Sequence, residues 1–281
     1  MASKRRRTPS MPGSDVNDAH VSLEIAQQAG RLLLELREDF LAEHGADLTR
    51  EQADRLRDLA DAESHTLIAR ALADARPDDA VLSEEGKDDS SRLEAARVWI
   101  VDPLDGTWEY GQIRSDFAVH IALWDMAEQR LSACTVDLPG QGLSRSVLDA
   151  DPGVHPLPTD RPIRIVASRS RPPETLERIV DDLSAVLAAG GITQGIEVVD
   201  VGSVGAKVNE VLAGRAEAYV HNTGFYEWDV AAPYGVALHY GLVPSHFDGS
   251  PVTFNHMPPY VTDLVVAHPE IAAALRSVLR T

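Results

Sequence analysis

From residue 163 to the end of the chain, short apolar runs alternate with segments of helical periodicity. The pattern predicts strands and helices in turn, at 163–167, 174–188, 197–201, 204–213, 216–221, 229–240, 264–267 and 269–280. Strands that alternate with helices are typical of an α/β layer, because the helices of such a layer cover the faces of its sheet. We therefore expect an α/β C-terminal half, residues 160–281.

The chain before this half begins with helices. Apolar residues recur at helical spacing over 21–36, which Asn17 or Asp18 can cap, and over 54–75, which stops before a proline. Four short apolar runs follow, and each predicts a strand: 80–82, 98–101, 117–123 and 131–136. We therefore expect an α+β N-terminal half, residues 16–150.

Two segments lack periodicity. Residues 1–15 are basic and rich in Ser, Pro and Gly, which predicts a disordered basic tail. Residues 149–162 contain four prolines, and we predict the boundary between the halves there.

Charge and composition exclude several classes of protein. The 26 Lys and Arg against 44 Asp and Glu give a formal net charge of −18, so most of the chain would repel the phosphates of a nucleic acid. No apolar run approaches the roughly 18 residues of a membrane span, and we expect no membrane partner. The lone Cys134 fits a reducing compartment, which predicts a cytoplasmic protein.

Three short acidic segments each follow an apolar run or begin a helical one: Ser83-Glu84-Glu85, the segment 102–107, and Trp228-Asp229. Carboxylates at the ends of buried strands or at a helix start lie where ligands usually bind in α/β proteins. Each segment also has an ordinary interpretation, as a solvated loop, a surface turn or a helix cap.

The middle segment favours a site over a turn. Asp102 follows a four-residue apolar run, and Pro103 is expected to end strand pairing there. Asp105 is close enough in sequence to share one ion with Asp102. If a helix starts here, the free N–H groups of Gly106 and Thr107 would face an anion such as phosphate.

The carboxylates of these segments need cations if they converge. Each like-charged pair about 4 Å apart costs on the order of 4 kcal/mol at an effective dielectric constant near 20. Two Mg²⁺ ions would balance the four charges of Glu84, Asp102, Asp105 and Asp229, and oxygen ligands suit Mg²⁺ better than zinc. A pair of metal ions suits the hydrolysis of a phosphate ester.

The three segments together resemble the inositol monophosphatase-like superfamily of Mg²⁺-dependent, typically lithium-sensitive phosphatases. The matching stretches are Ser-Glu-Glu at 83–85, Trp-Ile-Val-Asp-Pro-Leu-Asp-Gly-Thr at 99–107 and Trp-Asp-Val-Ala-Ala-Pro at 228–233. The resemblance implies a layered α/β/α/β/α sandwich with the active site between the halves, in which most metal ligands come from the N-terminal half. It is strongest to the 3′(2′),5′-bisphosphate nucleotidases, which implies a role in sulfate assimilation.

The resemblance also assigns the metal ligands. It implies two or three Mg²⁺ ions per active site, held by Glu84, Asp102, the Leu104 carbonyl, Asp105 and Asp229. Asp102 would bridge two ions.

Three further residues take catalytic roles by resemblance. Thr107 and Asp61 would activate the attacking water. Glu85 would lie next to the metal ligands without binding the metal itself. The family has Thr-x-Ala-Asp before this position, whereas here Asp58 stands where the Thr would be.

The substrate-binding residues are inferred from the residues around these motifs. Glu109 and Tyr110 fit the nucleotidase pattern, whereas Trp108 replaces its usual Lys or Arg and could either stack on a base or cover the loop. Segments 167–170 and 202–207 resemble nucleotidase stretches, although Lys207 could equally be a solvated helix residue. The predicted substrate contacts are Gly106, Thr107, Trp108, Arg169, Ser203, Lys207 and Glu227.

The expected partner is thus a small phosphate ester, a nucleotide bisphosphate. The expected reaction is removal of the 3′-phosphate from 3′-phosphoadenosine 5′-phosphate. An inositol monophosphatase or a fructose-1,6-bisphosphatase with broad specificity is the alternative. A non-catalytic sensor would lack a ligand, and an acidic interaction module has only the net charge in its favour. Dimers are common among relatives, so a homodimer stays open.

Overall fold

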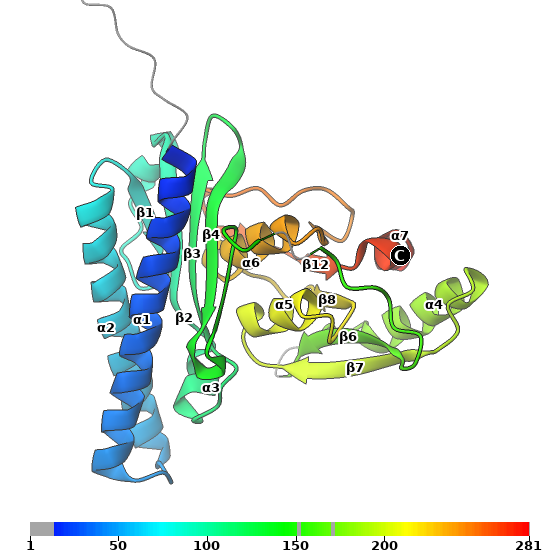
Figure 1. Cartoon of the computed structure of the whole chain (residues 1–281), viewed down its shortest axis with the longest axis horizontal. Helices are drawn as coiled ribbons and strands as arrows, with labels where there is room; N and C mark the ends of the chain where they lie inside the picture. Colours follow the sequence, from blue (N-terminus) through cyan, green and yellow to red (C-terminus); the bar gives the residue numbers. More distant parts are fainter. Residues whose placement is uncertain (1–13, 151–152, 170–171, 281) are drawn as a thin grey trace, which may run out of the picture.

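Five layers of helices and sheets stack across the molecule (Figure 1). The structure is a computed structural model, and it describes residues 14–150, 153–169 and 172–280. An outer pair of helices, α1 (Ser14–His44) and α2 (Arg50–Ala75), covers the first sheet. This arrangement confirms the predicted layered α/β/α/β/α sandwich.

The first sheet has the order β1-β2-β3-β4-β5. Its strands are β1 (Ala80–Ser83), β2 (Arg97–Asp105), β3 (Ala118–Asp125), β4 (Arg130–Leu138) and β5 (Leu143–Ser146). Strand β1 runs parallel to β2, and the other neighbours are antiparallel. A short helix, α3 (Thr107–Gly111), begins directly after β2.

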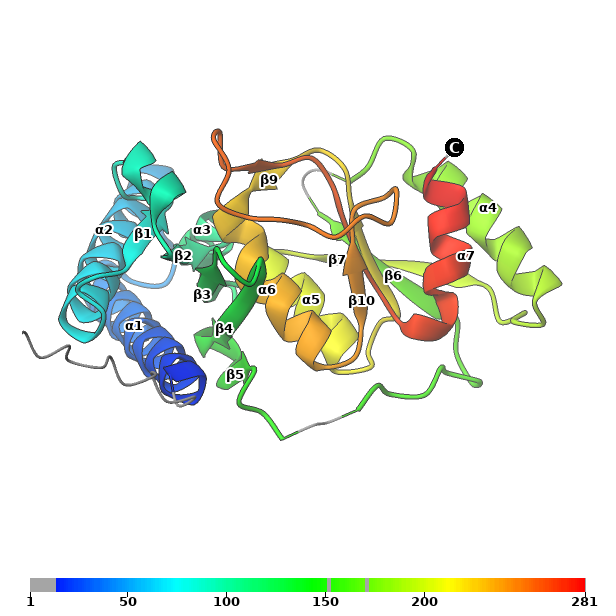
Figure 2. The same ribbon diagram turned by 90° about the horizontal axis from the view of Figure 1, so that it is seen from above.

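Two helices form the middle layer between the sheets, α5 (Val204–Leu212) and α6 (Glu227–His239) (Figure 2). Helix α6 packs against β2, β3 and β4, while α5 contacts β6, β8 and β12 of the second sheet as well as β3 and β4. The middle layer therefore belongs to the C-terminal half of the chain but shares its core with the N-terminal sheet.

The second sheet has the order β10-β12-β8-β6-β7. Its strands are β6 (Ile163–Ser168), β7 (Ile196–Val201), β8 (Ala218–His221), β10 (Val243–Ser245) and β12 (Leu264–Ala267). Helices α4 (Leu176–Ala189) and α7 (Pro269–Leu279) close its outer face through an apolar cluster of their own. A two-stranded ribbon, β9 (Phe225–Tyr226) and β11 (Tyr260–Val261), lies beside the start of α6.

The apolar run at 98–101 is continuous because β2 is buried on both faces. Val98 and Ile100 face the middle helices, whereas Trp99 and Val101 face α1 and α2. The side-chain period of two thus separates one sequence run into two cores.

Most predicted elements are present with shifted ends. Helix α2 begins at Arg50, where Thr49 accepts a hydrogen bond from Gln52 N–H and forms a capping box with it. Asp18 does not cap α1 but lies inside it, buried and ion-paired with Arg76 and Arg97.

The predicted tail falls mostly outside the described residues, which begin at residue 14, and residues 14 and 15 belong to α1. Residue 170, the last of the nucleotidase-like stretch 167–170, also lies outside the described residues. No helix of the described part of the chain is long and apolar enough to cross a bilayer.

Candidate active site

A bulge at the end of β2 brings two carboxylates to one face of the first sheet. Asp102 pairs with His120 of β3 and Asp105 pairs with Ala118, so the register shifts by one residue between them. Residues three apart on a regular strand would point to opposite faces, and the extra residue cancels this difference. Leu104 accordingly turns into the α1–α2 core. The expectation that Pro103 ends strand pairing is therefore wrong, because pairing with β3 resumes at Asp105.

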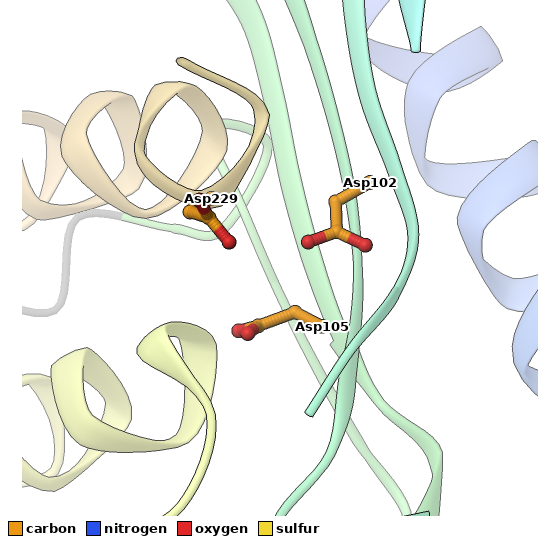
Figure 3. A group of neighbouring side chains, drawn as sticks. All are labelled: Asp102, Asp105 and Asp229. Carbon is orange, nitrogen blue, oxygen red and sulfur yellow. The ribbon is translucent and has the colours of Figure 1, made fainter. Parts of the chain in front are cut away.

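The third carboxylate comes from the first turn of α6. Asp229 accepts a hydrogen bond from the backbone N–H of Tyr226 at 2.8 Å, so it also caps the helix as its acidic position predicts. One oxygen each of Asp102, Asp105 and Asp229 lies within 4.8 Å of the others. Figure 3 shows the three side chains directed toward a common point from β2 and α6.

This cluster holds negative charge that is costly without a cation. Burial, and then the charges of Glu84, Asp105 and Asp229, raise the pKa of Asp102 well above its usual value. Partial burial and the charges of Asp61 and neighbouring carboxylates raise the pKa of Glu84 to about 7. A hydrogen bond with Asp102 lowers this pKa but does not outweigh the rise. Converging carboxylate oxygens of this kind fit a hard divalent cation, so the site could bind metal.

Asp105 is held in place by two groups that the sequence analysis did not single out. Its Oδ2 accepts a hydrogen bond from Gly205 N–H at 2.8 Å and lies 3.2 Å from Nε2 of buried His120. Burial lowers the pKa of His120, which favours the neutral ring. A Cβ on Gly205 would lie 2.5 Å from the same Nε2, so only glycine lets α5 approach this closely. The one sequence signal was that His120 is the single polar residue in the apolar run 117–123.

The predicted water-activating residues lie around the cluster. Asp61 on α2 is partly buried and has Glu85 and Asp58 as its negative neighbours. Burial first, and these charges second, raise the pKa of Asp61 to about 7. Thr107 begins α3, as expected of a helix starting at this point, and its hydroxyl donates to the carbonyl oxygen of Leu104 at 3.1 Å.

A pocket of about 250 Å³ opens over the carboxylates. Nine predicted residues besides Lys207 line it: Glu84, Asp102, Leu104, Asp105, Gly106, Thr107, Trp108, Ser203 and Asp229. Lys207 is 4% exposed, so it is not the solvated helix residue of the ordinary interpretation. The hydroxyl of Ser203 accepts a hydrogen bond from Ala206 N–H and so caps α5.

Arg169 and Glu227 lie outside this lining. The guanidinium of Arg169 pairs with Glu109 at 3.3 Å and with Asp116 at 3.1 Å, and so ties the end of β6 to the N-terminal half. Glu227 is fully buried, and its two oxygens accept hydrogen bonds from the N–H groups of Asn255 and His256 at 2.6 and 2.7 Å. The structure therefore gives Glu227 a backbone-holding role in place of the predicted substrate contact.

The loop held by Glu227 also reaches buried Arg92, which the sequence analysis missed. Arg92 donates to the side chain of Asn255 and to the carbonyl oxygen of His256, and it pairs with Asp88. This network joins the segment after Glu84 to the start of the helix that carries the third carboxylate.

Comparison with known proteins decides the family. A sequence profile of the inositol monophosphatase family matches residues 17–146 and 155–280. The chain belongs to the inositol monophosphatase family. A protein of Mycobacterium leprae named 3′-phosphoadenosine 5′-phosphate phosphatase is 40% identical over 278 residues, which cover 95% of each chain. The 3′(2′),5′-bisphosphate nucleotidase CysQ of Escherichia coli K12 is 29% identical over 205 residues, covering 70% of this chain and 78% of that one.

Solved structures of the inositol monophosphatase family share the fold. CysQ from Bacteroides thetaiotaomicron matches with a TM-score of 0.68 and 26% identity, over 89% of this chain and 97% of that one. Inositol monophosphatase II from Staphylococcus aureus matches with a TM-score of 0.68 at 18% identity, over 93% and 92% of the two chains. The chain is therefore an enzyme of this family that hydrolyses phosphate esters.

Proposed function

We propose that the chain is a Mg²⁺-dependent phosphatase that removes the 3′-phosphate of 3′-phosphoadenosine 5′-phosphate and yields AMP. The observation that carries this proposal is the cluster of Asp102, Asp105 and Asp229 at the floor of a pocket that also holds buried Lys207. The Mycobacterium leprae relative, which carries that substrate in its name, supports the choice of ester.

The metal ions would be held by Glu84, Asp102, the Leu104 carbonyl, Asp105 and Asp229. Bound Mg²⁺ supplies a polarised water and neutralises the charge of the transferred phosphoryl group. The pKa of Asp61, raised to about 7, makes this carboxylate a suitable acceptor for the proton that the attacking water must lose. Glu85 would keep that pKa high, because it lies among the negative neighbours of Asp61.

Substrate charge is matched by Lys207, because a chain of net charge −18 needs a local cation where an anionic ester binds. Lys207 lines the same pocket as the carboxylates, and we assign it to the second phosphate of the nucleotide. The N–H groups of Gly106 and Thr107, at the end of β2, would face the phosphate that is cleaved.

Trp108 is the residue that keeps the alternative substrate, inositol phosphate, in the comparison. Trp108 stands where nucleotidases carry Lys or Arg, and it lines the pocket with half of its surface exposed. A changed residue at this wall can change which ester fits.

The test compares phosphate release from 3′-phosphoadenosine 5′-phosphate, inositol 1-phosphate and fructose 1,6-bisphosphate, with millimolar Mg²⁺ and with EDTA. We expect at least a tenfold preference in kcat/KM for the nucleotide, loss of activity in EDTA, and inhibition by Li⁺. A comparable or faster rate on inositol 1-phosphate would establish the alternative. Release that persists in EDTA would overturn the metal site.

A further inference from the structure

A buried arginine connects the segment after Glu84 with a loop of the C-terminal half. Arg92 is 1% exposed, and all three of its guanidinium nitrogens donate hydrogen bonds. Two bonds go to the carboxylate of Asp88, at 2.7 and 3.0 Å. The others go to the side chain of Asn255 at 2.6 Å and to the carbonyl oxygen of His256 at 2.8 Å. Because Asp88 follows Glu84 by only four residues, one planar group joins the two segments.

Asn255 receives this contact in a backbone conformation that few residues adopt. Its φ of 68° lies in the left-handed region, which Asn tolerates better than most other residues. Its N–H donates to Glu227 at 2.6 Å, and its side-chain amide donates to the carbonyl oxygen of Arg92 at 3.0 Å. The side chain of Asn255 therefore bonds Arg92 twice, once as an acceptor and once as a donor.

Glu227 connects the same loop to the first turn of α6. Its carboxylate accepts hydrogen bonds from the N–H groups of Asn255 and His256, at 2.6 and 2.7 Å. Its own N–H donates to the carbonyl oxygen of Pro259 at 3.0 Å. Glu227 is the first residue of α6 and lies two residues before Asp229. The loop is thus bonded to the helical turn that carries one of the proposed metal ligands.

Stability alone is a weak explanation for a buried arginine. Removal of a guanidinium from water is costly, and an apolar side chain in the same space is often at least as stabilising as a buried ion pair. A guanidinium differs from an apolar group in its fixed fork of donors, which sets the relative position of everything that it bonds. Here the bonded segments lead to Glu84 in one half of the chain and to Asp229 in the other.

We propose that Arg92 is a positioning residue of the metal site. With Asn255 and Glu227 it forms a connection, here called the Arg92 brace, that fixes the segment after Glu84 relative to the first turn of α6. Arg92 and Asn255 lie outside the lining of the catalytic pocket, so they act on Mg²⁺ only through the ligands that they position. The inference rests on the proposed Mg²⁺-dependent function and adds a determinant of its metal affinity.

The test uses Asn255→Gly, because glycine keeps the left-handed backbone and removes both side-chain bonds to Arg92. Calorimetry of metal-free protein with Mg²⁺ should show about fivefold weaker binding than wild type, less than the roughly 10–100-fold effect of a direct partner of a ligand. The Mg²⁺ concentration for half-maximal phosphate release should rise by a similar factor. At saturating Mg²⁺, kcat should stay within about twofold of wild type, on the nucleotide and on inositol 1-phosphate alike.

The matched control is Arg161→Ala, which removes a similar set of contacts elsewhere. Arg161 donates two hydrogen bonds to the carboxylate of Glu217 and others to the carbonyl oxygens of Pro162 and Gly214, all outside the catalytic pocket. Its loss should lower the melting temperature and leave the Mg²⁺ affinity unchanged. Equal weakening of Mg²⁺ binding in Arg161→Ala and Asn255→Gly would mean that general destabilisation is the cause, and it would overturn the brace.

Arg92→Lys tests whether Arg92 and Asn255 act together. Lysine keeps the charge, but its ammonium lacks the planar fork that bonds both segments, so the Mg²⁺ affinity should again fall about fivefold. Residues that share one connection have non-additive effects. The double variant should therefore bind Mg²⁺ less weakly than the product of the two single effects predicts. Single effects that multiply fully would overturn the shared connection.

The outcomes separate the brace from the proposed function. If wild type and both single variants bind Mg²⁺ equally, the brace is wrong and the proposed function is unaffected. A lower kcat at saturating Mg²⁺ with unchanged Mg²⁺ binding would also overturn the brace. If wild type binds no Mg²⁺ in calorimetry and releases no phosphate, the metal site fails, and the brace fails with it.

Discussion

At the scale of single residues, the active site combines groups that repel each other with groups that hold them in place. Asp102 is buried among carboxylates, and Asp105 is fixed by the Gly205 N–H and His120. The first arrangement destabilises the metal-free fold, and the second keeps the geometry ready for an ion. Stability and metal affinity should therefore respond to different substitutions.

Metal-free protein should lose stability as pH rises. The pKa values of Asp61 and Glu84 are about 7 in the fold, against about 4 in an unfolded chain. The folded state thus binds more protons between pH 4 and 7, so its free energy of unfolding falls across this range. Melting curves in EDTA should show the fall, and Mg²⁺ should reverse most of it at pH 7.

Asp102→Asn gives the matching control for that experiment. It removes one buried charge, so the variant should melt at a higher temperature than wild type in EDTA and gain less from Mg²⁺. Its activity should drop about 100-fold or more, since even outer partners of metal ligands are worth about 10–100-fold. Full activity in Asp102→Asn would refute the ligand assignment.

His120 offers a test of positioning without loss of a ligand. His120→Ala removes one of the two groups that hold Asp105 and leaves the Gly205 N–H in place. Because Asp105 is then positioned less well, the Mg²⁺ concentration for half-maximal activity should rise about tenfold. The activity at saturating Mg²⁺ should fall less. His246→Ala is the control, because His246 lies in the loop after β10 and outside the catalytic pocket. An unchanged Mg²⁺ requirement in His120→Ala would contradict the role.

At the scale of elements, local signals were readable and long-range pairings were not. The carboxylate segments could be found because each follows a strand or begins a helix, and their convergence then follows from the layers. The contacts of Arg92 with Asn255 join residues far apart in sequence, and no local pattern indicates such a pair. The short β9 and β11 are too brief for an alternation to show.

In two elements, the predicted end differs from the observed one for a local physical reason. Helix α2 begins four residues before the predicted 54–75, because a capping box at Thr49 and Gln52 precedes the apolar repeat. Pro103 was expected to end β2, but its missing N–H falls within the bulge, where no ladder bond is required.

The cap of α2 makes a testable contribution to stability. Thr49→Ala should lower the free energy of unfolding by about 1 kcal/mol, because the backbone N–H of Gln52 in the first turn loses its partner. For a chain of this size, the melting temperature should fall by roughly 2–4 °C. Thr66→Ala removes an exposed hydroxyl that bonds Ala62 in the middle of the same helix, and it should change stability much less.

At the scale of the whole molecule, the active site lies where two sheets meet across the middle helices. Asp102 and Asp105 come from the first sheet, whereas Asp229 and Lys207 come from the middle layer, which the second half of the chain supplies. The pairing of Arg169 with Glu109 and Asp116 joins the second sheet to the first half beside this site. Catalysis thus depends on how the halves are held together.

A substitution of Arg169 can distinguish its two suggested roles, a contact between the halves and a contact with the substrate. As a contact between the halves, Arg169→Ala should lower kcat/KM for nucleotide and inositol phosphate by similar factors, whereas a substrate contact would affect the nucleotide alone. Kinetics on both esters distinguish these outcomes. Arg164→Ala is the matched control, because Arg164 pairs with Glu197 within the second sheet.

The bulge in β2 also constrains how this enzyme can change over evolution. The two aspartates face one way because they pair with His120 and Ala118, which lie two residues apart on β3. The length of the segment between the aspartates is not what sets this direction. Loss of residue 103 or 104 would remove the bulge and leave the aspartates two residues apart on a regular strand, where they would still share a face. In a lineage that keeps this chemistry, the segment can therefore change in sequence or lose its bulge, provided that both pairings with β3 are kept.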